Sequence, residues 1–328
     1  MYSAGTPARG LVRIGIVLLL FALYPVVFPG SMNVGFSLVL FAALATSWDL
    51  IGGWAGQLSL GHAAFVGFGA YASVLLWLRL GVPLWWGVPA AMAAGAVLAV
   101  AWGSLTFRLR GAYFSLSTIA IAEILRVVAT NWVDLTGGPE GISVNELPTP
   151  FGLDLFDRRI QFALALALLA VALLASWRVS TSRFGHRLEA IREDQDSSMA
   201  LGVNPARLKV FAFAASAALT VAGGALYALH LSFFEPHGVF DLHLSVQLVL
   251  MAIVGGMGSV LGPTLGAVLL LTLQELFRNA FQQASLFIYG VIIVLIVRYA
   301  PDGLSGWIGA RWRRIRNGRR PVGELSQG

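Results

Sequence analysis

The feature that most constrains this chain is a series of apolar runs of membrane-spanning length, which recur from one end of the sequence to the other. A helix needs about 20 apolar residues to cross the hydrocarbon core of a bilayer. Lipid offers no partners for backbone N–H and C=O groups, and these runs are too long for barrel strands, so each run is expected to be a helix. The sequence therefore predicts an all-α, polytopic membrane protein.

The composition supports this fold class. Only 12% of the residues are charged and 57% are hydrophobic, whereas about a quarter of a soluble domain is charged. The chain contains no cysteine, which excludes disulfides and thiolate chemistry. The net charge of +6 comes from arginines dispersed around the apolar runs, a pattern that membrane topology explains better than nucleic-acid binding does.

We expect about ten transmembrane helices within a single transmembrane domain that comprises residues 1–328. The approximate ranges are 11–29, 33–51, 57–78, 84–104, 112–130, 160–177, 209–230, 243–258, 262–277 and 284–300. No small-residue cleavage site follows the first run, so this run is expected to be a retained span and not a signal peptide.

Charge tests this count. If the N-terminus is inside and the spans alternate, seventeen of the 22 basic residues fall in inside segments. Four fall outside, and these are Arg79, Arg158, Arg159 and Arg278. Cytoplasmic loops carry an excess of Lys and Arg, so both termini are predicted to be cytoplasmic.

Three segments outside the spans are long enough to have a function. The outer loop at about 131–159 contains TGGPEG, and the tail at 301–328 contains RWRRIRNGRR, which suits a stop signal beside anionic lipid. The cytoplasmic loop at about 178–208 is expected to hold one amphipathic helix from about Arg187 to Leu201 that docks on a cytoplasmic partner. The alternative is a solvated connector on the bilayer, but its acidic residues disfavour simple attachment to anionic lipid.

A glycine-rich stretch, GGWAGQLSLGHAAFVGFGAY at 52–71, interrupts the apolar pattern. Irregular backbone at membrane depth is tolerated only when it is buried in protein or lines a cavity. Gln57, Ser59 and His62 at the start of the 57–78 span are therefore candidates for lining a translocation path. A second stretch, GGMGSVLG at 255–262, echoes the first and suggests an internal repeat.

Ionisable residues inside spans are the other candidates. Glu123 and Arg126 lie three apart on one helix face. They form either an ion pair that fixes helix packing or a lining for a polar or zwitterionic solute, since charged groups at membrane depth face the protein interior or water. Asp49 and Glu275 lie near span ends and are expected to reach the membrane interface.

Several glycines are expected to permit close packing of helices. Gly258, Gly262 and Gly266 are spaced four apart, as in small-residue helix interfaces. Gly52 and Gly56 are expected to allow close approach of backbones in the same way.

The chain has no nucleotide-binding loop of the form G-x-x-x-x-G-K-[ST], since its single lysine, Lys209, lies between Leu208 and Val210. We therefore expect no catalytic residue and no bound cofactor. If transport is driven by ATP, another polypeptide hydrolyses it. His237 and His243, in FFEPHGVFDLH, have no spacing typical of zinc sites and are better explained by an interfacial turn, so no metal is expected.

Five stretches together resemble the LivM-type permease subunits of branched-chain amino acid ABC importers. They are WDLIGGWAGQLSLGHAAFVGFGAY, GAYFSLSTIAIAEILRVVATNW, TGGPEGI, HRLEAIREDQDSSMALGVNPARLKVFAFAASA and VGGMGSVLGPTLGAV, which lie within roughly 33–300. The resemblance implies the ABC importer permease fold in a bacterial or archaeal cytoplasmic membrane. It also implies a heterodimer with a second permease, two cytoplasmic ATPase subunits that use ATP, and an extracytoplasmic solute-binding protein that contacts loops 134–146 and 232–242.

The resemblance also implies a docking role for the cytoplasmic loop. The acidic-Ala-Ala pattern and downstream Gly of the family correspond here to Asp196, Ser197, Ser198 and Gly202, so both alanines are serine. Glu189 and Glu193 complete the docking candidates. Permeases for urea or short-chain amides, and sugar permeases, are the alternatives within the superfamily. An ion-coupled secondary transporter using Glu123, Arg126 or Asp49 is the alternative from another class.

Overall fold

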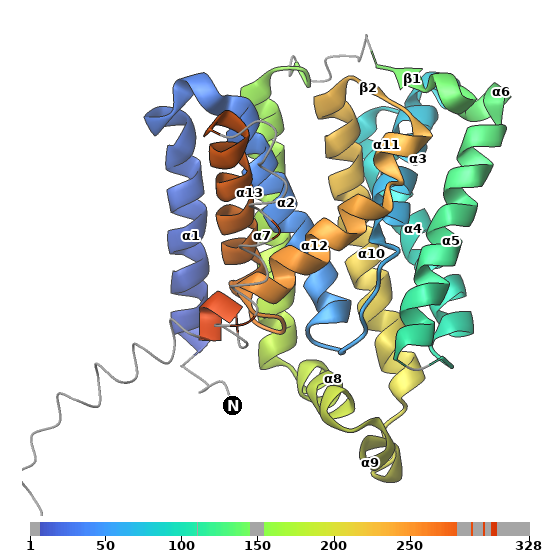
Figure 1. Cartoon of the computed structure of the whole chain (residues 1–328), viewed down its shortest axis with the longest axis vertical. Coiled ribbons are helices and arrows are strands. Elements are labelled where there is room, and N and C mark those ends of the chain that lie inside the picture. Colours follow the sequence, from blue (N-terminus) through green and yellow to red (C-terminus); the bar gives the residue numbers. More distant parts are fainter. Residues whose placement is uncertain are drawn as a thin grey trace, which may run out of the picture.

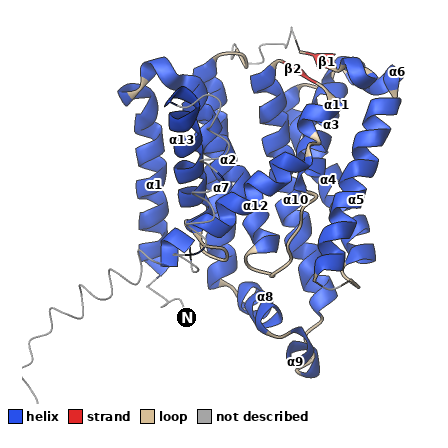
Figure 2. Ribbon diagram, in the orientation of Figure 1, coloured by secondary structure: helices blue, strands red, loops and turns tan. Residues whose placement is uncertain are grey.

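The computed structural model describes residues 7–109, 111–144, 154–280, 290, 298 and 303–306, and nearly all of this part is helical (Figure 2). The elements are α1 (Pro7–Val27), η1 (Pro29–Ser31), α2 (Met32–Gly52), α3 (His62–Leu80), α4 (Leu84–Thr106), α5 (Ala112–Asn131), α6 (Val133–Thr136), η2 (Gly138–Glu140), β1 (Ile142–Ser143), α7 (Arg158–Thr181), α8 (Arg183–Glu193), α9 (Gln195–Ala200), α10 (Pro205–Leu231), β2 (Phe233–Phe234), α11 (Pro236–Val239), α12 (Leu242–Gly255) and α13 (Gly262–Ala280).

The helices confirm a multi-pass, all-α membrane protein. Eight helical segments of the described chain are long and apolar enough to cross a bilayer, and a shorter apolar helix covers Gly262–Phe277. These nine correspond to the first nine predicted spans, with α11 and α12 together forming the eighth. The predicted span at 284–300 lies outside the described residues, apart from Gly290 and Arg298.

The ends of the helices alternate as the charge pattern requires. In Figure 1, α2 ends at the lower end of the bundle, where α8 and α9 also lie, whereas α6, β1 and β2 lie at the upper end. Residues 303–306 lie near the lower end, where the Ser305 hydroxyl is 3.2 Å from that of Ser259. The assignment of the lower end to the cytoplasm stays a prediction of the charge pattern.

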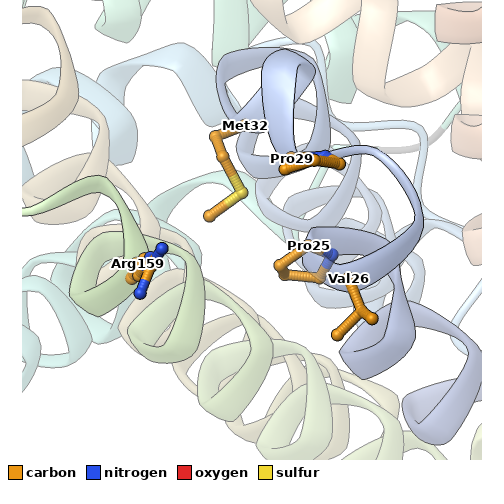
Figure 3. A pocket seen from close by; sticks show the side chains of 5 residues that line it. All are labelled: Pro25, Val26, Pro29, Met32 and Arg159. Atoms are coloured by element: carbon orange, nitrogen blue, oxygen red, sulfur yellow. The ribbon is translucent and has the colours of Figure 1, made fainter.

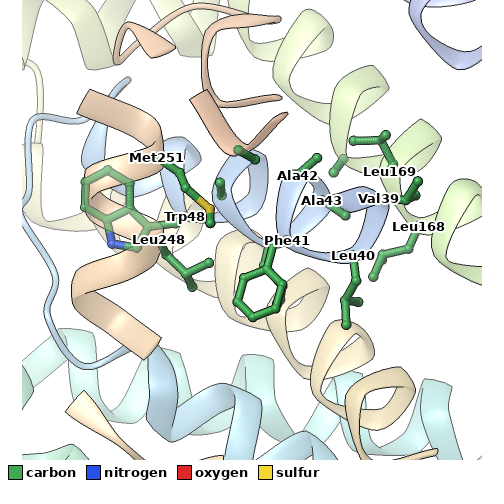
Figure 4. Close-up of a cluster of buried hydrophobic side chains, with 14 of the residues drawn as sticks. Val39, Leu40, Phe41, Ala42, Ala43, Trp48, Leu168, Leu169, Leu248 and Met251 are labelled. Atoms are coloured by element: carbon green, nitrogen blue, oxygen red, sulfur yellow. The ribbon is translucent and has the colours of Figure 1, made fainter. Parts of the chain in front are cut away.

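Helix α2 is the centre of the bundle. From Phe36 to Gly52 almost every side chain is buried, among them the large Trp48 and Leu40. A helix that is apolar all round is expected in such a position. Its side chains pack with Leu168 and Leu169 from α7 and with Leu248 and Met251 from α12 (Figure 4). In contrast, α1 lies at the periphery and is mostly exposed.

Glycines bring α3 and α10 unusually close. A Cβ atom at Gly69 would lie 2.1 Å from the carbonyl oxygen of Val221, and one at Gly224 would lie 2.1 Å from that of Val66. Larger side chains at these positions would force the helices apart, which is the packing device typical of membrane bundles.

A small ribbon joins the two outer loops at the upper end. Strand β1 pairs with β2 in antiparallel fashion, with Ile142 opposite Phe234 and Ser143 opposite Phe233. The guanidinium of Arg79, at the end of α3, donates to the carbonyl oxygen of Asp134 in the same region. This ribbon is the one departure from the all-α prediction in the described part of the chain.

Two predicted helices have different bounds in the structure. The third span begins at His62 and not near 57, because the chain is non-helical from Gly53 to Gly61. The predicted helix 187–201 is two helices, α8 and α9, separated at Asp194. Asp194 has an extended backbone (φ −152°, ψ 109°), and its side chain accepts hydrogen bonds from the first amides of α9, so it ends one helix and begins the next.

A surface depression of about 310 Å³ lies at the upper end between α1 and α7 (Figure 3). Pro25, Val26, Pro29, Met32 and Arg159 line it. It contains none of the predicted site residues.

Candidate translocation and coupling site

Residues 53–61 form an irregular segment that leaves the lower end of α2 and rises to the start of α3 (Figure 1). Its backbone groups find partners on neighbouring helices. Trp48 Nε1 donates to Ser59 O (2.8 Å), Ser115 Oγ donates to Leu58 O (2.6 Å), and Leu60 N donates to Thr118 Oγ1 (3.0 Å). These contacts explain how non-helical backbone is accommodated in a membrane protein, because lipid offers it no partners.

His62 is the centre of a buried polar network. Its Nδ1 lies 2.9 Å from the Ser59 hydroxyl and its Nε2 lies 2.8 Å from the Ser216 hydroxyl, and all three residues are fully buried. The Ser216 hydroxyl donates its one proton to the carbonyl oxygen of Ser47, so it accepts from Nε2–H. Nδ1 is then the acceptor from Ser59. With the ring protons assigned in this way, the hydrogen bonds of His62 in α3 connect the irregular segment, through Ser59, with α10, through Ser216. The bond from Ser216 to Ser47 extends the network to α2.

Of the three polar residues predicted to line a path, only Gln57 reaches the surface of the chain. It is half-buried, next to the exposed Leu58, and its amide donates to the carbonyl oxygen of Gly56 at 3.3 Å. Ser59 and His62 contribute to internal packing in this chain, because their hydrogen bonds are satisfied within it. A path-lining role for these residues stays a prediction; within this chain Ser59 and His62 lie in the interior, and Gln57 lies at the surface.

Asp49 differs most from its expected position. It was expected to reach the interface, but it is fully buried in the last turn of α2. Its carboxylate accepts a hydrogen bond from the amide of Gly258 at 2.9 Å. The physical reason is that the loop between α12 and α13 covers the end of α2 and offers a backbone donor to the carboxylate.

The two glycine-rich stretches that resemble each other in sequence meet at this point. A Cβ atom at Gly53 would lie 2.3 Å from the amide nitrogen of Gly258. Gly258 has φ +72°, a left-handed conformation that favours glycine. Both stretches follow a helix, α2 or α12, and precede another, α3 or α13.

Arg192 reaches this junction from α8. Its Nη1 donates to the carbonyl oxygen of Gly53 at 2.7 Å, and its Cγ lies over Gly56. Sequence reasoning did not single out Arg192, although its place near the end of an amphipathic helix with buried Leu188 and Ile191 was a usable signal.

Helices α8 and α9 project below the bundle and are anchored to it (Figure 1). Leu188 and Ile191 are buried, and the ammonium of Lys209 in α10 donates to Gln195 Oε1 in α9 at 2.6 Å. The predicted docking residues Glu189, Glu193 and Asp196 are exposed on this pair of helices, and Gly202 is exposed in the turn after α9.

Asp194 fixes the junction of the two helices. Hydrogen bonds from the Ser197 hydroxyl, the Ser197 amide and the Asp196 amide hold the pKa of the Asp194 carboxyl below its usual range. Hydrogen bonds to the charged form of a carboxyl favour that form. The carboxylate therefore caps α9 at neutral pH.

Glu123 and Arg126 form the predicted ion pair on α5, with Arg126 Nε 2.8 Å from Glu123 Oε2. Arg126 Nη1 also lies 2.8 Å from Nδ1 of His237 in α11. The pair lies on the outside of the chain, because the side chain of Glu123 is 53% exposed and that of Arg126 is 23% exposed.

The predicted packing glycines have two different roles. Gly262 and Gly266 bring α13 against α12, since a Cβ atom at Gly266 would lie 1.8 Å from the carbonyl oxygen of Met251. Gly52 instead makes room for the indole of Trp48, and Gly56 and Gly258 lie in loops, so the prediction of helix packing is wrong for these three. The spacing of these glycines in the sequence did not reveal that α2 ends before Gly56 and that α12 ends before Gly258.

The comparisons with known proteins agree with these observations. Residues 31–297 match the family described as branched-chain amino acid transport system / permease component. The high-affinity branched-chain amino acid transport system permease protein LivM of Salmonella typhimurium is 31% identical over 299 residues, which cover 84% of this chain and 70% of that protein. LivM of Escherichia coli is 30% identical over 299 residues, which also cover 84% of this chain and 70% of that protein.

A second type of permease is more distantly similar. LivH of Escherichia coli is 22% identical over 290 residues, which cover 81% of this chain and 91% of that protein. No solved structure matches this chain significantly. The match covers most of the chain, including the irregular segment, α8 and α9, and the chain belongs to the family of permease components of branched-chain amino acid transport systems.

Proposed function

We propose that this chain is a membrane-spanning permease subunit of an ATP-driven ABC importer that translocates branched-chain or related amino acids. The observation that carries the proposal is the family match over residues 31–297. The anchored pair α8 and α9, which projects from the end predicted to be cytoplasmic, supports it further, since such a unit suits docking on an ATPase. The chain itself is then a transport subunit and not an enzyme.

The energy for transport comes from partner subunits in this proposal. The sequence contains no phosphate-binding loop, and its only lysine lies at the start of α10. We infer that two cytoplasmic ATPase subunits hydrolyse ATP and contact Glu189, Glu193, Asp196 and Gly202. Closure of the ATPases would move α8 and α9 and switch the spans between outward and inward access.

The path would lie on the side of the chain that carries Glu123 and Arg126. Charged groups at membrane depth avoid lipid and face protein or water. A second, homologous permease subunit would cover this face and complete a path with it. A carboxylate and a guanidinium together match the two charges of a zwitterionic amino acid. The irregular segment that carries Gln57 contacts the same helix, since the Leu58 carbonyl oxygen accepts a hydrogen bond from Ser115 of α5.

Loading would occur at the upper end. The ribbon of β1 and β2 joins the two outer loops into one surface, and the exposed Glu140 and Glu235 border it. An extracytoplasmic binding protein is expected to deliver the solute to this surface. The cytoplasmic membrane of a bacterium or archaeon is the compartment that fits such a system.

Titration of the binding protein encoded beside this gene tests the substrate class. We expect isothermal titration calorimetry to show tight binding of leucine and no binding of urea or simple amides. Tight binding of urea without leucine would overturn the amino-acid assignment while leaving the permease assignment intact. A gene neighbourhood with two ATPases and a binding protein is the matching expectation for the subunits.

A further inference from the structure

We propose that Arg192 is a positioning residue that transmits the movement of α8 to the irregular segment 53–61. This inference rests on the proposed function, because it assigns the route by which a docked ATPase would act on the spans. The side chain of Arg192 is the link between an exposed docking helix and the glycine-rich junction at the end of α2.

The contacts of Arg192 involve both glycine-rich stretches. Its Nη1 donates to the Gly53 carbonyl oxygen at 2.7 Å. The same nitrogen lies 2.5 Å from the position that a Cβ atom of Gly258 would take, and its Cγ lies 2.8 Å from the corresponding position at Gly56. The guanidinium and its aliphatic stem thus occupy space that any residue larger than glycine would fill.

Each end of this link is held firmly. On the α8 side, Leu188 and Ile191 are buried in the bundle, so the helix cannot rotate freely about its axis. On the membrane side, the side chain of Asp49 accepts a hydrogen bond from the Gly258 amide, which fixes the loop that Arg192 also contacts. A displacement of α8 therefore pulls on the Gly53 peptide and is not absorbed by a loose side chain.

From Gly53 the displacement has a continuous route to the proposed path. Within a few residues the chain reaches Leu58, whose carbonyl oxygen accepts from Ser115 on α5, the helix of Glu123 and Arg126. Ser59 follows and contacts His62. An arginine suits this position because its planar guanidinium offers five donors in a fixed geometry, whereas a lysine offers a flexible point charge.

The absence of cysteine allows a direct test in the assembled transporter. A single Leu58→Cys substitution places a thiol on an exposed residue of the irregular segment. The complex with its permease partner, ATPases and binding protein is reconstituted in proteoliposomes. The rate of thiol labelling by a small water-soluble maleimide is then compared without nucleotide and with ATP plus vanadate. Leucine uptake per ATP hydrolysed is measured separately in the cysteine-free chain.

We expect the labelling rate to differ between the two nucleotide states and Arg192→Met to abolish that difference. Uptake per ATP should fall about tenfold, within the range typical of coupling between two sites. Co-purification of the ATPases should stay unchanged, because methionine keeps the aliphatic stem and the docking surface is untouched. Arg192→Lys should give an intermediate uptake ratio. Arg178→Met, at an exposed arginine at the end of α7, is the matched control and should change nothing.

A second pair of variants approaches the link from the membrane side. Gly56→Ala pushes a methyl group toward the aliphatic stem of Arg192. Gly81→Ala is the matched control, because Gly81 has nearly the same φ (+65°, against +67° at Gly56) but no neighbouring atom that the methyl group would meet. Only Gly56→Ala should lower uptake per ATP. Normal coupling in Arg192→Met, or equal losses in the two alanine variants, would overturn the inference. Failure of the proposed function itself appears differently, as no ATP-dependent uptake in the unmodified complex.

Discussion

The buried carboxylate of Asp49 accepts a hydrogen bond from the backbone amide of Gly258 at 2.9 Å, across 209 positions of sequence. This bond joins the two glycine-rich stretches of the chain. It fixes the end of α2, the central helix, to the loop between α12 and α13. Arg192 covers the same junction, so the stability of the bundle and the proposed coupling depend on one cluster of contacts.

Asp49→Ala is expected to destabilise the chain by about 1–3 kcal/mol, because it removes a buried hydrogen bond and leaves the Gly258 amide without its partner. Thermal unfolding in detergent, followed by a fluorescent probe or by scattering, measures the change. Asp134→Ala is the control, since Asp134 is exposed and its role in the structure is through its backbone carbonyl. Equal unfolding temperatures for the two variants would contradict the role of Asp49.

His62→Phe keeps an aromatic ring in the core and removes both ring nitrogens. We expect a loss of about 1–3 kcal/mol in stability, because the hydroxyl of Ser59 loses its acceptor in a fully buried site. His243→Phe, at an exposed residue of α12, should have little effect on unfolding. A stable His62→Phe variant with lost uptake would instead return His62 to the translocation path.

The sequence alone was sufficient for the membrane fold, because apolar runs of spanning length and dispersed arginines constrain helices and topology strongly. Features that depend on contacts between distant parts of the chain could not be predicted from the sequence. Nothing local to Asp49 reveals that a loop 209 residues away covers it, so it was expected at the interface. In the same way, Ser59 and His62 have the residue types of a path lining, and only the partners Ser216 and Ser47 show that they are buried.

The break between α8 and α9 at Asp194 is a second feature that the sequence did not predict. The composition of the docking segment suits one helix, and the choice between continuing and capping depends on the hydrogen bonds that the carboxylate makes to α9. The turn at Asn204, in contrast, was predictable, since Asn before Pro is a typical helix start, and Asn204 does cap α10.

Glu123→Gln is expected to change uptake more than stability. Exposed ion pairs contribute about 0.2–1 kcal/mol, so the unfolding temperature should change little. If the pair faces the solute, the relative uptake of leucine and of uncharged analogues should change in proteoliposomes that contain the variant complex. A clear fall in stability with unchanged selectivity would assign the pair to packing. Glu140→Gln, in the outer loop, is the matched control for loss of one carboxylate.

Asp194→Ala should loosen α9 and weaken ATPase binding, whereas Asp194→Asn should largely preserve both, since asparagine caps helices well. Hydrogen exchange of residues 195–200 and co-purification of the ATPases measure the two effects. Because the pKa of Asp194 is lowered in the folded chain, the extra stabilisation by the charged form is complete at neutral pH. It is lost as the pH falls through this lowered pKa. Equal exchange in both variants would contradict the cap.

The central claim is that this chain forms the membrane path of an ATP-driven importer, and uptake of radiolabelled leucine into proteoliposomes tests it most directly. The proposal predicts uptake only when the second permease, the ATPases with ATP, and the external binding protein are all present together with this chain. Omission of this chain alone should abolish uptake. Leucine accumulation by this chain on its own, driven by a proton gradient without ATP, would contradict the claim.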